Sequence, residues 1–221
     1  PIEWGIEQHM NNRAYRAFDL FSSNTEISFE ELKKIKFDLY YSEKSVMVQY
    51  INDIIKAIDI SSLDFQDVKS VLADWNLSTH PENREAALAI LSTKPFIQFQ
   101  YRKLDDAILL EHTRNAEKYL KKFHGSLRVP FGDVQRLVWG ETDIAIGGGP
   151  DILRAVYSTY DGNGRLRGTA GDGLFFFVKW DKNGTVISES IHQYGSATTR
   201  HTSPHYDDQA HLFVKEKMKP T

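Results

Sequence analysis

The chain has 221 residues, a formal net charge of −3 and no cysteine. The length indicates one large domain or two small ones, and the lack of cysteine excludes disulfides, thiolate metal sites, iron–sulfur clusters and cysteine nucleophiles. Acidic and basic residues are mixed along the sequence without a basic block, so nucleic acid is not an expected partner, and no apolar run is long enough to span a membrane.

The first half of the chain has a helical pattern. Its start at Pro1, without Met or an apolar leader, indicates a processed chain or a fragment of a longer one. From residue 4 to about residue 124, apolar residues recur at helical spacing and predict five or six helices joined by short loops. Ser28 and Glu31 have the spacing of a capping box, which predicts a helix start. The apolar stripes are Ile6, Met10, Ala14, Ala17 and Phe21; Val46, Tyr50, Ile51, Ile54, Ile55 and Ile58; Phe65, Val68, Val71, Leu72 and Trp75; Leu88 and Leu91; and Leu104, Ile108, Tyr119, Leu120 and Phe123.

After Gly125 the residues become typical of strands. The turn sequences DGNG at 161–164 and NG at 183–184 separate runs rich in β-branched and aromatic residues, and so predict β-hairpins. The apolar run FFFV at 175–178 is typical of a strand covered on both faces. We therefore expect an α+β fold, with a helical region at 1–124 and a small antiparallel β part at 125–221. Because one helical layer leaves an apolar sheet face and sheet edges open, we expect either oligomerisation or strands supplied by another polypeptide.

Polar residues near the carboxyl end allow more than one interpretation. Imidazole and carboxylate side chains there would suit a zinc or non-haem iron site, but no His-Glu-x-x-His spacing is present. Histidine and aspartate in turns more often bond backbone groups, so we expect no metal. The candidate ligands are His192, His201, His205, His211, Asp207 and Asp208. Elsewhere, Gly147–Pro150 lacks the ending of a phosphate loop and is interpreted as a flexible connection, and His112 as a core histidine.

Arg13 is the main candidate among the charged residues. With about 100° of rotation per residue, it lies roughly 60° from the centre of the stripe through Met10, along the flank predicted to be buried. An unpaired guanidinium would be costly there. From the residues alone, a structural ion pair or an arginine that reaches solvent explains it, and a functional role is the alternative.

Several motifs, taken in order, resemble the β-subunit of the penicillin acylase family. They are GIEQHMNNRAYRAFDLF, IKFDLYY, VPFGDVQRLVWGETDIAIGGGPDILRAVYST, GDG, YGS and SPHYDDQAHLF. Their order and spacing across nearly the whole chain carry the resemblance, and SPHYDDQ is its most specific part. The branch with acyl-homoserine lactone acylases and aculeacin-type acylases is the most similar. The GDG motif at 171–173 departs from the Gly-Asp-Ser/Thr that is usual in the family.

The resemblance implies an N-terminal nucleophile hydrolase with an αββα core, of which this chain is an incomplete domain. Family members hydrolyse acyl amides through an acyl-enzyme on the first residue of the β chain. Pro1 has no nucleophilic side chain, so the nucleophile and the oxyanion Asn are expected upstream, and none is assigned here. Arg13 aligns with the family's active-site arginine, which supports the geometry of the oxyanion and the nucleophile.

The same resemblance sets expectations for partners, location and cofactors. The partners are the remaining α- and β-chain segments of one precursor and a small acyl amide substrate. The parent is expected in the periplasm or outside the cell. No cofactor is expected in this chain, although some relatives bind calcium in the full-length protein. The isolated chain is expected to be inactive, and a self-sufficient, non-catalytic binding module is the alternative.

The SPHYDDQ motif is interpreted as structural. Ser203 and Pro204 are expected to set a turn. The polar side chains after them are expected to bond the backbone of neighbouring loops; they are His205, Tyr206, Asp208 and Gln209.

Overall fold

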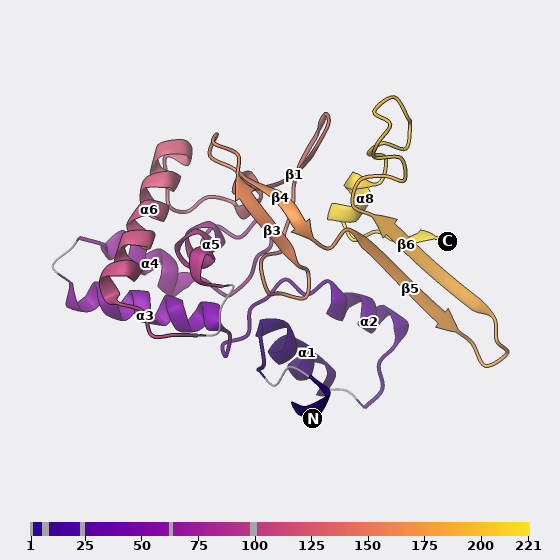
Figure 1. Cartoon of the computed structure of the whole chain (residues 1–221), viewed down its shortest axis with the longest axis horizontal. Coiled ribbons are helices and arrows are strands. Elements are labelled where there is room, and N and C mark those ends of the chain that lie inside the picture. The colour runs from indigo at the N-terminus through magenta and orange to yellow at the C-terminus, as the bar shows by residue number, and fades with distance from the viewer. Residues whose placement is uncertain (1, 6–8, 23–24, 62–63, 98–100) are drawn as a thin grey trace.

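Most helices of the described chain precede its sheets. A computed structural model describes residues 2–5, 9–22, 25–61, 64–97 and 101–221 (Figure 1). The helices before Gly125 are α1 (Asn12–Ser22), α2 (Phe29–Lys36), α3 (Val46–Ile60), α4 (Gln66–Asp74), α5 (Ala86–Thr93) and α6 (Asp106–His124), with 3-10 turns at Ile2–Trp4 and Lys94–Phe96. None of the helices in the described ranges combines the length and apolar character needed to cross a membrane.

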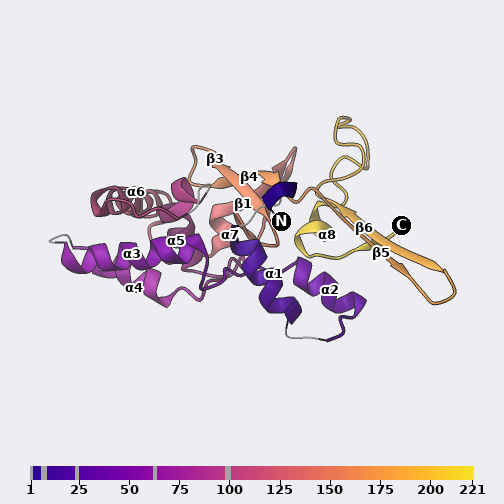
Figure 2. The same ribbon diagram turned by 60° about the horizontal axis from the view of Figure 1, so that its bottom comes forward.

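The main core lies around α5. All eight residues of α5 are buried, as expected for a helix that is apolar on every side. The helices α3, α4 and α6 surround it at one end of the molecule (Figures 1 and 2). The predicted stripes of α3 and α4 are confirmed, since Ile54, Ile58 and Val68 are buried there. His112 of α6 is half-buried, with its ring edge-on to Phe96.

The first predicted stripe does not form a buried face. Ile6 lies outside the described residues. Met10 precedes α1, and both Met10 and Phe21 are exposed. The residue that α1 buries is Asn12, whose side chain is held by hydrogen bonds. Tertiary polar contacts therefore place α1, rather than an apolar stripe.

The second half contains two sheets, which confirms the α+β class. The first has the strand order β2-β1-β4-β3 and the second β5-β6-β7. The sequence pattern predicts antiparallel pairing, and the structure adds one parallel pair, between β1 and β4. The elements are α7 (Phe131–Val134), β1 (Gln135–Trp139), β2 (Thr142–Ala145), β3 (Val156–Tyr160), β4 (Leu166–Gly171), β5 (Leu174–Trp180), β6 (Val186–His192), α8 (Ala210–Val214) and β7 (Lys219–Pro220).

Both predicted hairpins are present. β3 and β4 pair around the DGNG turn, and β5 and β6 pair around the NG turn. In the second turn, the carboxylate of Asp181 accepts hydrogen bonds from the main-chain N–H groups of Asn183 and Thr185, each at 2.8 Å. Gly184 there has φ +82, which glycine adopts without steric cost. The turn residues thus set the register of the strands.

One face of the β5–β6 hairpin is open. On the other face, Phe175 is buried against Phe37 and Phe213. Phe29 of α2 also packs on this face, with its ring edge-on to that of Phe177 in β5. The prediction that the FFFV run is covered on both faces is therefore wrong for the described chain, because alternate residues of β5 point to solvent. We call the exposed residues the open face; they are Leu174, Phe176, Trp180 and Val186. The hairpin lies at the opposite end from α3 and α6 (Figure 2).

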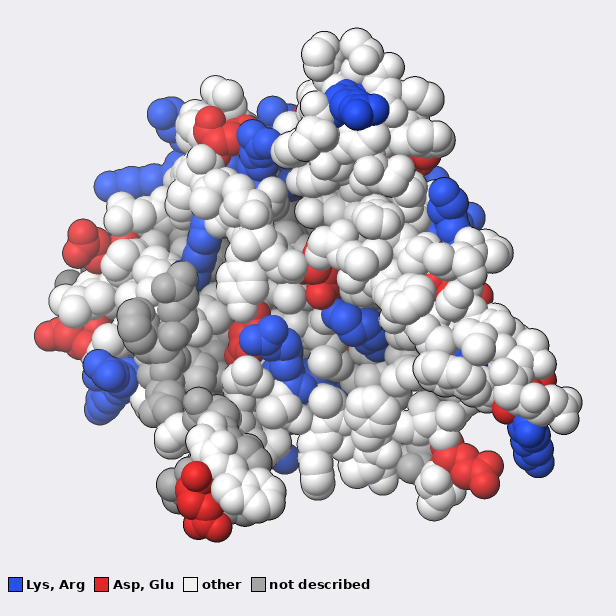
Figure 3. All heavy atoms as spheres, turned by 45° about the vertical axis from the view of Figure 1, so that its right-hand side comes forward, with Lys and Arg blue, Asp and Glu red and all other residues white. Residues whose placement is uncertain are grey.

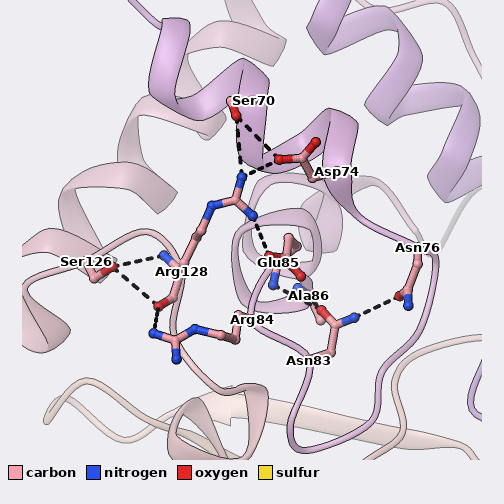
Figure 4. Close-up of polar contacts among 9 residues, drawn as sticks. All are labelled: Ser70, Asp74, Asn76, Asn83, Arg84, Glu85, Ala86, Ser126 and Arg128. Atoms are coloured by element: carbon pink, nitrogen blue, oxygen red, sulfur yellow. Dashed lines mark hydrogen bonds and ion pairs between the residues drawn. The ribbon is translucent and has the colours of Figure 1, made fainter.

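A polar clamp joins the helical region to the first sheet (Figure 4). The guanidinium of Arg128, between α6 and α7, donates to the carboxylates of Asp74 and Glu85. Its main-chain oxygen accepts from Arg84 at 3.0 Å. Before α5, the side-chain oxygen of Asn83 accepts from the N–H of Ala86, the first residue of that helix, at 2.7 Å. The loop before α5 and the segment leading to β1 are thus held together.

Candidate functional site

The start of α1 is fixed by a residue 139 positions away in the sequence. The main-chain N–H of Asn12 donates to Oδ2 of Asp151 at 2.9 Å, and Nδ2 of Asn12 donates to the main-chain oxygen of Asp151 at 2.8 Å. Oδ1 of Asn12 accepts from the N–H of Ser42 at 2.7 Å. The carboxylate of Asp151 thus satisfies a helix N-terminal donor that has no partner within the helix, and its charge suits the helix dipole.

The loop that carries Asp151 is buried and tightly packed. The hydroxyl of Tyr41 donates to the main-chain oxygen of Pro150 at 2.6 Å. A Cβ added to Gly149 would lie 3.0 Å from that hydroxyl, and one added to Gly148 would lie 2.6 Å from a backbone oxygen. The interpretation of Gly147–Pro150 as a flexible connection is therefore wrong. The glycines allow the backbone to approach its neighbours closely.

Arg13 lies at the surface, beside Asp151. Its Nε is 3.4 Å from Oδ1 of Asp151, and its side chain is 45% exposed, against 17% for Asp151. The prediction that Arg13 follows a buried flank is wrong, because the face that α1 buries is the one with Asn12. The structure thus gives Arg13 an ion-pair partner and leaves part of its guanidinium open to solvent.

Charges of both signs gather around this site. One turn further along α1, Arg16 binds the carboxylate of Asp38 through Nε at 2.9 Å and NH2 at 2.6 Å. Burial raises the pKa of the Asp151 carboxyl, although the hydrogen bond from Asn12 and the charge of Arg13 act in the opposite direction. Figure 3 shows acidic and basic side chains side by side in a hollow near the centre of one face. The charges near the start of α1 are thus arranged in ion pairs.

A second charged cluster lies behind the site, under β5. Only 2% of the Arg154 side chain is exposed, and its NH1 has no hydrogen-bond partner among the described residues. Its guanidinium lies 3.6 Å from Asp172 and 3.7 Å from Glu216. Lys36 also donates to Asp172, at 3.0 Å. Burial lowers the pKa of Lys36; Asp172 opposes this effect, whereas Arg154 and Arg13 add to it. Lys36 thus interacts electrostatically with Arg13 of the first cluster and with Arg154 of the second.

The SPHYDDQ segment packs on the loop after β6 and on the β1–β2 turn. Oγ of Ser203 accepts from the N–H of His205 at 3.1 Å within a turn that contains Pro204. The main-chain oxygen of His205 accepts from the N–H of Ala197 at 3.0 Å. A Cβ added to Gly195 would lie only 2.2 Å from that oxygen, so the two segments are in close contact.

The polar side chains of the motif make contacts of three kinds: with backbone, with each other and with an aromatic ring. Gln209 accepts from the main-chain N–H of His192 at 3.1 Å. His205 and Asp208 bond each other, with Nδ1 and Oδ2 3.0 Å apart, instead of bonding neighbouring backbone. Tyr206 packs its ring near that of Trp139, with 5.8 Å between centroids. These contacts connect loops.

The C-terminal histidines do not converge on one point. Within the described part of the chain, no group of three or more His, Asp or Glu side chains is placed to hold a metal ion. Asp207 is instead bonded to Thr142, whose hydroxyl donates to its carboxylate at 2.6 Å. The structure therefore offers no ligand set on which metal chemistry could be argued for these residues.

Sequence reasoning missed three of the residues that shape the site: Asp151, Asn12 and Arg154. Asp151 follows a glycine run that looks like a linker, and its partners are far away in the sequence. Asn12 is polar and stands in a stretch with an apolar stripe. Arg154 precedes a strand, where an arginine is usually exposed. The one available signal was the departure of Asn12 and Arg13 from the apolar pattern.

Comparison with known protein families gives a match over nearly the whole chain. The family described as penicillin amidase matches residues 2–221. This range includes the start of α1 with Arg13, the loop with Asp151 and the SPHYDDQ segment. No curated protein matches the sequence.

Proposed function

This chain belongs to the penicillin amidase family, and we propose that it is the C-terminal part of an acylase β-subunit. Its parent would hydrolyse N-acyl amides such as acyl-homoserine lactones, β-lactam side chains or lipopeptides, in the periplasm or outside the cell. The nucleophile would be carried by another segment of the same precursor. In the described chain, the observation that carries this proposal is the position of Arg13, held by Asp151 and partly open to solvent.

The chemistry of amide hydrolysis gives Arg13 a defined role. In the family's reaction, the nucleophile's oxygen attacks the amide carbonyl, its proton passes through its own α-amine to the leaving amine, and an acyl-enzyme forms. Water then hydrolyses the acyl-enzyme. A guanidinium near the α-amine lowers that amine's pKa and keeps it neutral, as a base must be. It also favours the negative charge that develops on the carbonyl oxygen.

The open face of the β5–β6 hairpin supports a contribution from other segments. Phe176 is 57% exposed and Trp180 65% exposed on the same side of one strand. β5 is also an edge strand, whose free backbone groups can pair with a further strand. We propose that the remaining α- and β-chain segments of the precursor cover this face and complete an αββα core.

The proposal is tested by comparing the isolated chain with the complete precursor on a chromogenic acyl amide. We expect turnover by the complete, processed protein and none by residues 1–221 alone. Phenylmethylsulfonyl fluoride should block that turnover, and peptide mass spectrometry should locate its adduct outside this chain. Turnover by the isolated chain that survives purification and is lost in Arg13→Ala would contradict the proposal.

A further inference from the structure

The carboxylate of Asp151 makes two separate contacts. Oδ2 accepts from the main-chain N–H of Asn12 at 2.9 Å, and Oδ1 lies 3.4 Å from Nε of Arg13. One oxygen therefore accepts a hydrogen bond from the helix start, and the other forms an ion pair with the side chain of the next residue. A carboxylate held at the helix start in this way attracts the guanidinium and favours one direction of it relative to the axis of α1.

The carboxylate is itself held in place by its own backbone. Asp151 has φ +59, a left-handed conformation that is unusual for a residue other than glycine or asparagine. Its main-chain oxygen accepts from Nδ2 of Asn12, and the preceding Pro150 accepts from the hydroxyl of the buried Tyr41. A non-glycine residue keeps such a conformation when the surrounding contacts over-determine it, often at a functional site. These contacts therefore leave little freedom for the Asp151 side chain.

On the basis of the proposed function, we propose that Asp151 is a positioning residue, which orients the guanidinium of Arg13 toward the reaction centre. A guanidinium bound at Nε can present its outer nitrogens to the nucleophile and the oxyanion. Arg16 is held differently, because Asp38 binds it through both Nε and an outer nitrogen. Arg13 is thus preorganised, and Arg16 is neutralised in a closed ion pair.

The contact is tested first on the chain itself, by NMR of the arginine Nε–H groups. Asp151→Asn keeps the shape, tolerates the left-handed backbone and can still accept from Asn12, but it removes the charge that holds Arg13. We expect the Arg13 Nε–H signal to disappear through fast exchange with water, while the Arg16 signal stays. Asp38→Asn is the matched control and should affect Arg16 alone. An unchanged Arg13 signal in Asp151→Asn would overturn the proposal, whatever reaction the parent catalyses.

The role in the reaction is tested in the complete, processed enzyme. Asp151→Asn should lower kcat by about 10²-fold, the effect of a small misplacement of a reacting group, with little change in KM. In an Arg13→Ala background it should cause no further loss, because both changes remove the same contribution. If Asp151→Asn does not fold, Asp151→Gly removes the carboxylate while keeping the backbone conformation.

The two possible failures can be told apart. If Arg13→Ala lowers kcat and Asp151→Asn does not, the positioning role is wrong and the proposed function stands. If neither variant changes kcat although the NMR signal is lost, Asp151 holds Arg13 but Arg13 does not serve the reaction. That second result would overturn the positioning role in catalysis together with the part of the proposed function that concerns Arg13.

Discussion

The guanidinium of Arg154 lies 4.3 Å from the centroid of the Phe213 ring, within the core between β5 and α8. The ring of Phe175, which stacks on that of Phe213 with 5.3 Å between the centroids, lies 4.7 Å from the same guanidinium. A cation close to two aromatic rings is attracted to them, which offsets part of its lost hydration. Asp172 and Glu216 supply the opposite charge. Arg154 therefore joins the β4–β5 connection to the C-terminal segment through both packing and charge.

Removing this arginine should destabilise the chain strongly. Arg154→Ala leaves Asp172 and Glu216 without their buried partner and opens a space beside the two rings. We expect a loss of about 3–5 kcal/mol in the free energy of unfolding, measured by urea denaturation. Lys69→Ala, which breaks the ion pair with Asp59 on the surface, is the control and should cost less than about 1 kcal/mol. Equal losses in the two variants would show that burial of Arg154 is not important.

The packing of the SPHYDDQ segment can be tested with a pair of glycines. A Cβ at Gly195 would meet the main-chain oxygen of His205 at 2.2 Å, whereas the nearest atom to a Cβ at Gly173 is 3.9 Å away. Gly195→Ala should therefore cost about 1–3 kcal/mol through overpacking. Gly173→Ala should have a much smaller effect on the midpoint of thermal unfolding. Similar midpoints for both variants would argue against a close contact between the segments.

The open face should give the isolated chain a measurable apolar surface. We expect the chain to bind a hydrophobic fluorescent dye or to self-associate, because Phe176 and Trp180 lie exposed on one side of β5. The double variant Phe176→Ser and Trp180→Ser should reduce dye fluorescence and aggregation without lowering the free energy of unfolding. Phe175→Ser, on the buried side of the same strand, should instead destabilise the fold.

A different result would favour the alternative of a self-sufficient binding module. If the isolated wild-type chain is a monodisperse monomer that melts cooperatively and binds no dye, the open face does not behave as an uncovered core surface. Analytical ultracentrifugation and calorimetry on the same sample provide the two measurements. That outcome would contradict a contribution of other segments at this face.

Stability should depend on pH through Glu216. Burial raises the pKa of its carboxyl above the ordinary value of 4.5, with Arg154 and Lys36 opposing. The folded state then holds the proton more tightly than the unfolded state, so stability falls as pH rises from about 4.5 through the folded pKa. Glu216→Gln stays neutral and keeps the same backbone. It should therefore match wild type near pH 4 and exceed it at pH 7 in urea denaturation.

The opposite sign at pH 7 would contradict this explanation. A Glu216→Gln variant less stable than wild type would mean that attraction to Arg154 outweighs the cost of burying the carboxylate. Glu43→Gln makes the same chemical change at an exposed position and serves as the control. Its stability relative to wild type should vary little across the same pH range.

The local parts of the fold could be predicted from the sequence. The stripe of α3, the capping box at Ser28 and the Asn-Gly turn at 183–184 each depend on residues a few positions apart, and all are present. Local signals of this kind act within one element, so a single sequence reveals them. The parallel pairing of β1 with β4 depends on residues about 30 positions apart and has no such signal.

The site could be predicted only in part, because its contacts are non-local. Arg13 was identified through resemblance to a family, whereas Asp151 stands behind a glycine run that has the composition of a linker. Close approach of Tyr41 to this loop turns it into a rigid support, and that approach exists only in the folded chain. Arg154 likewise packs against the rings of Phe175 and Phe213, which are more than twenty residues away in the sequence, so no local pattern reveals its role.

The most direct measurement is kcat/KM of the complete enzyme with Arg13→Ala, compared with Arg16→Ala on the same helix. Arg13 is held by Asp151 with its guanidinium partly open, whereas Arg16 is closed in a pair with Asp38. We predict that Arg13→Ala lowers kcat/KM on an acyl amide by on the order of 10²-fold, the effect of losing a group that stabilises the oxyanion. Arg16→Ala should leave kcat/KM close to wild type. Equal values for both variants would contradict a role for Arg13 at the reaction centre.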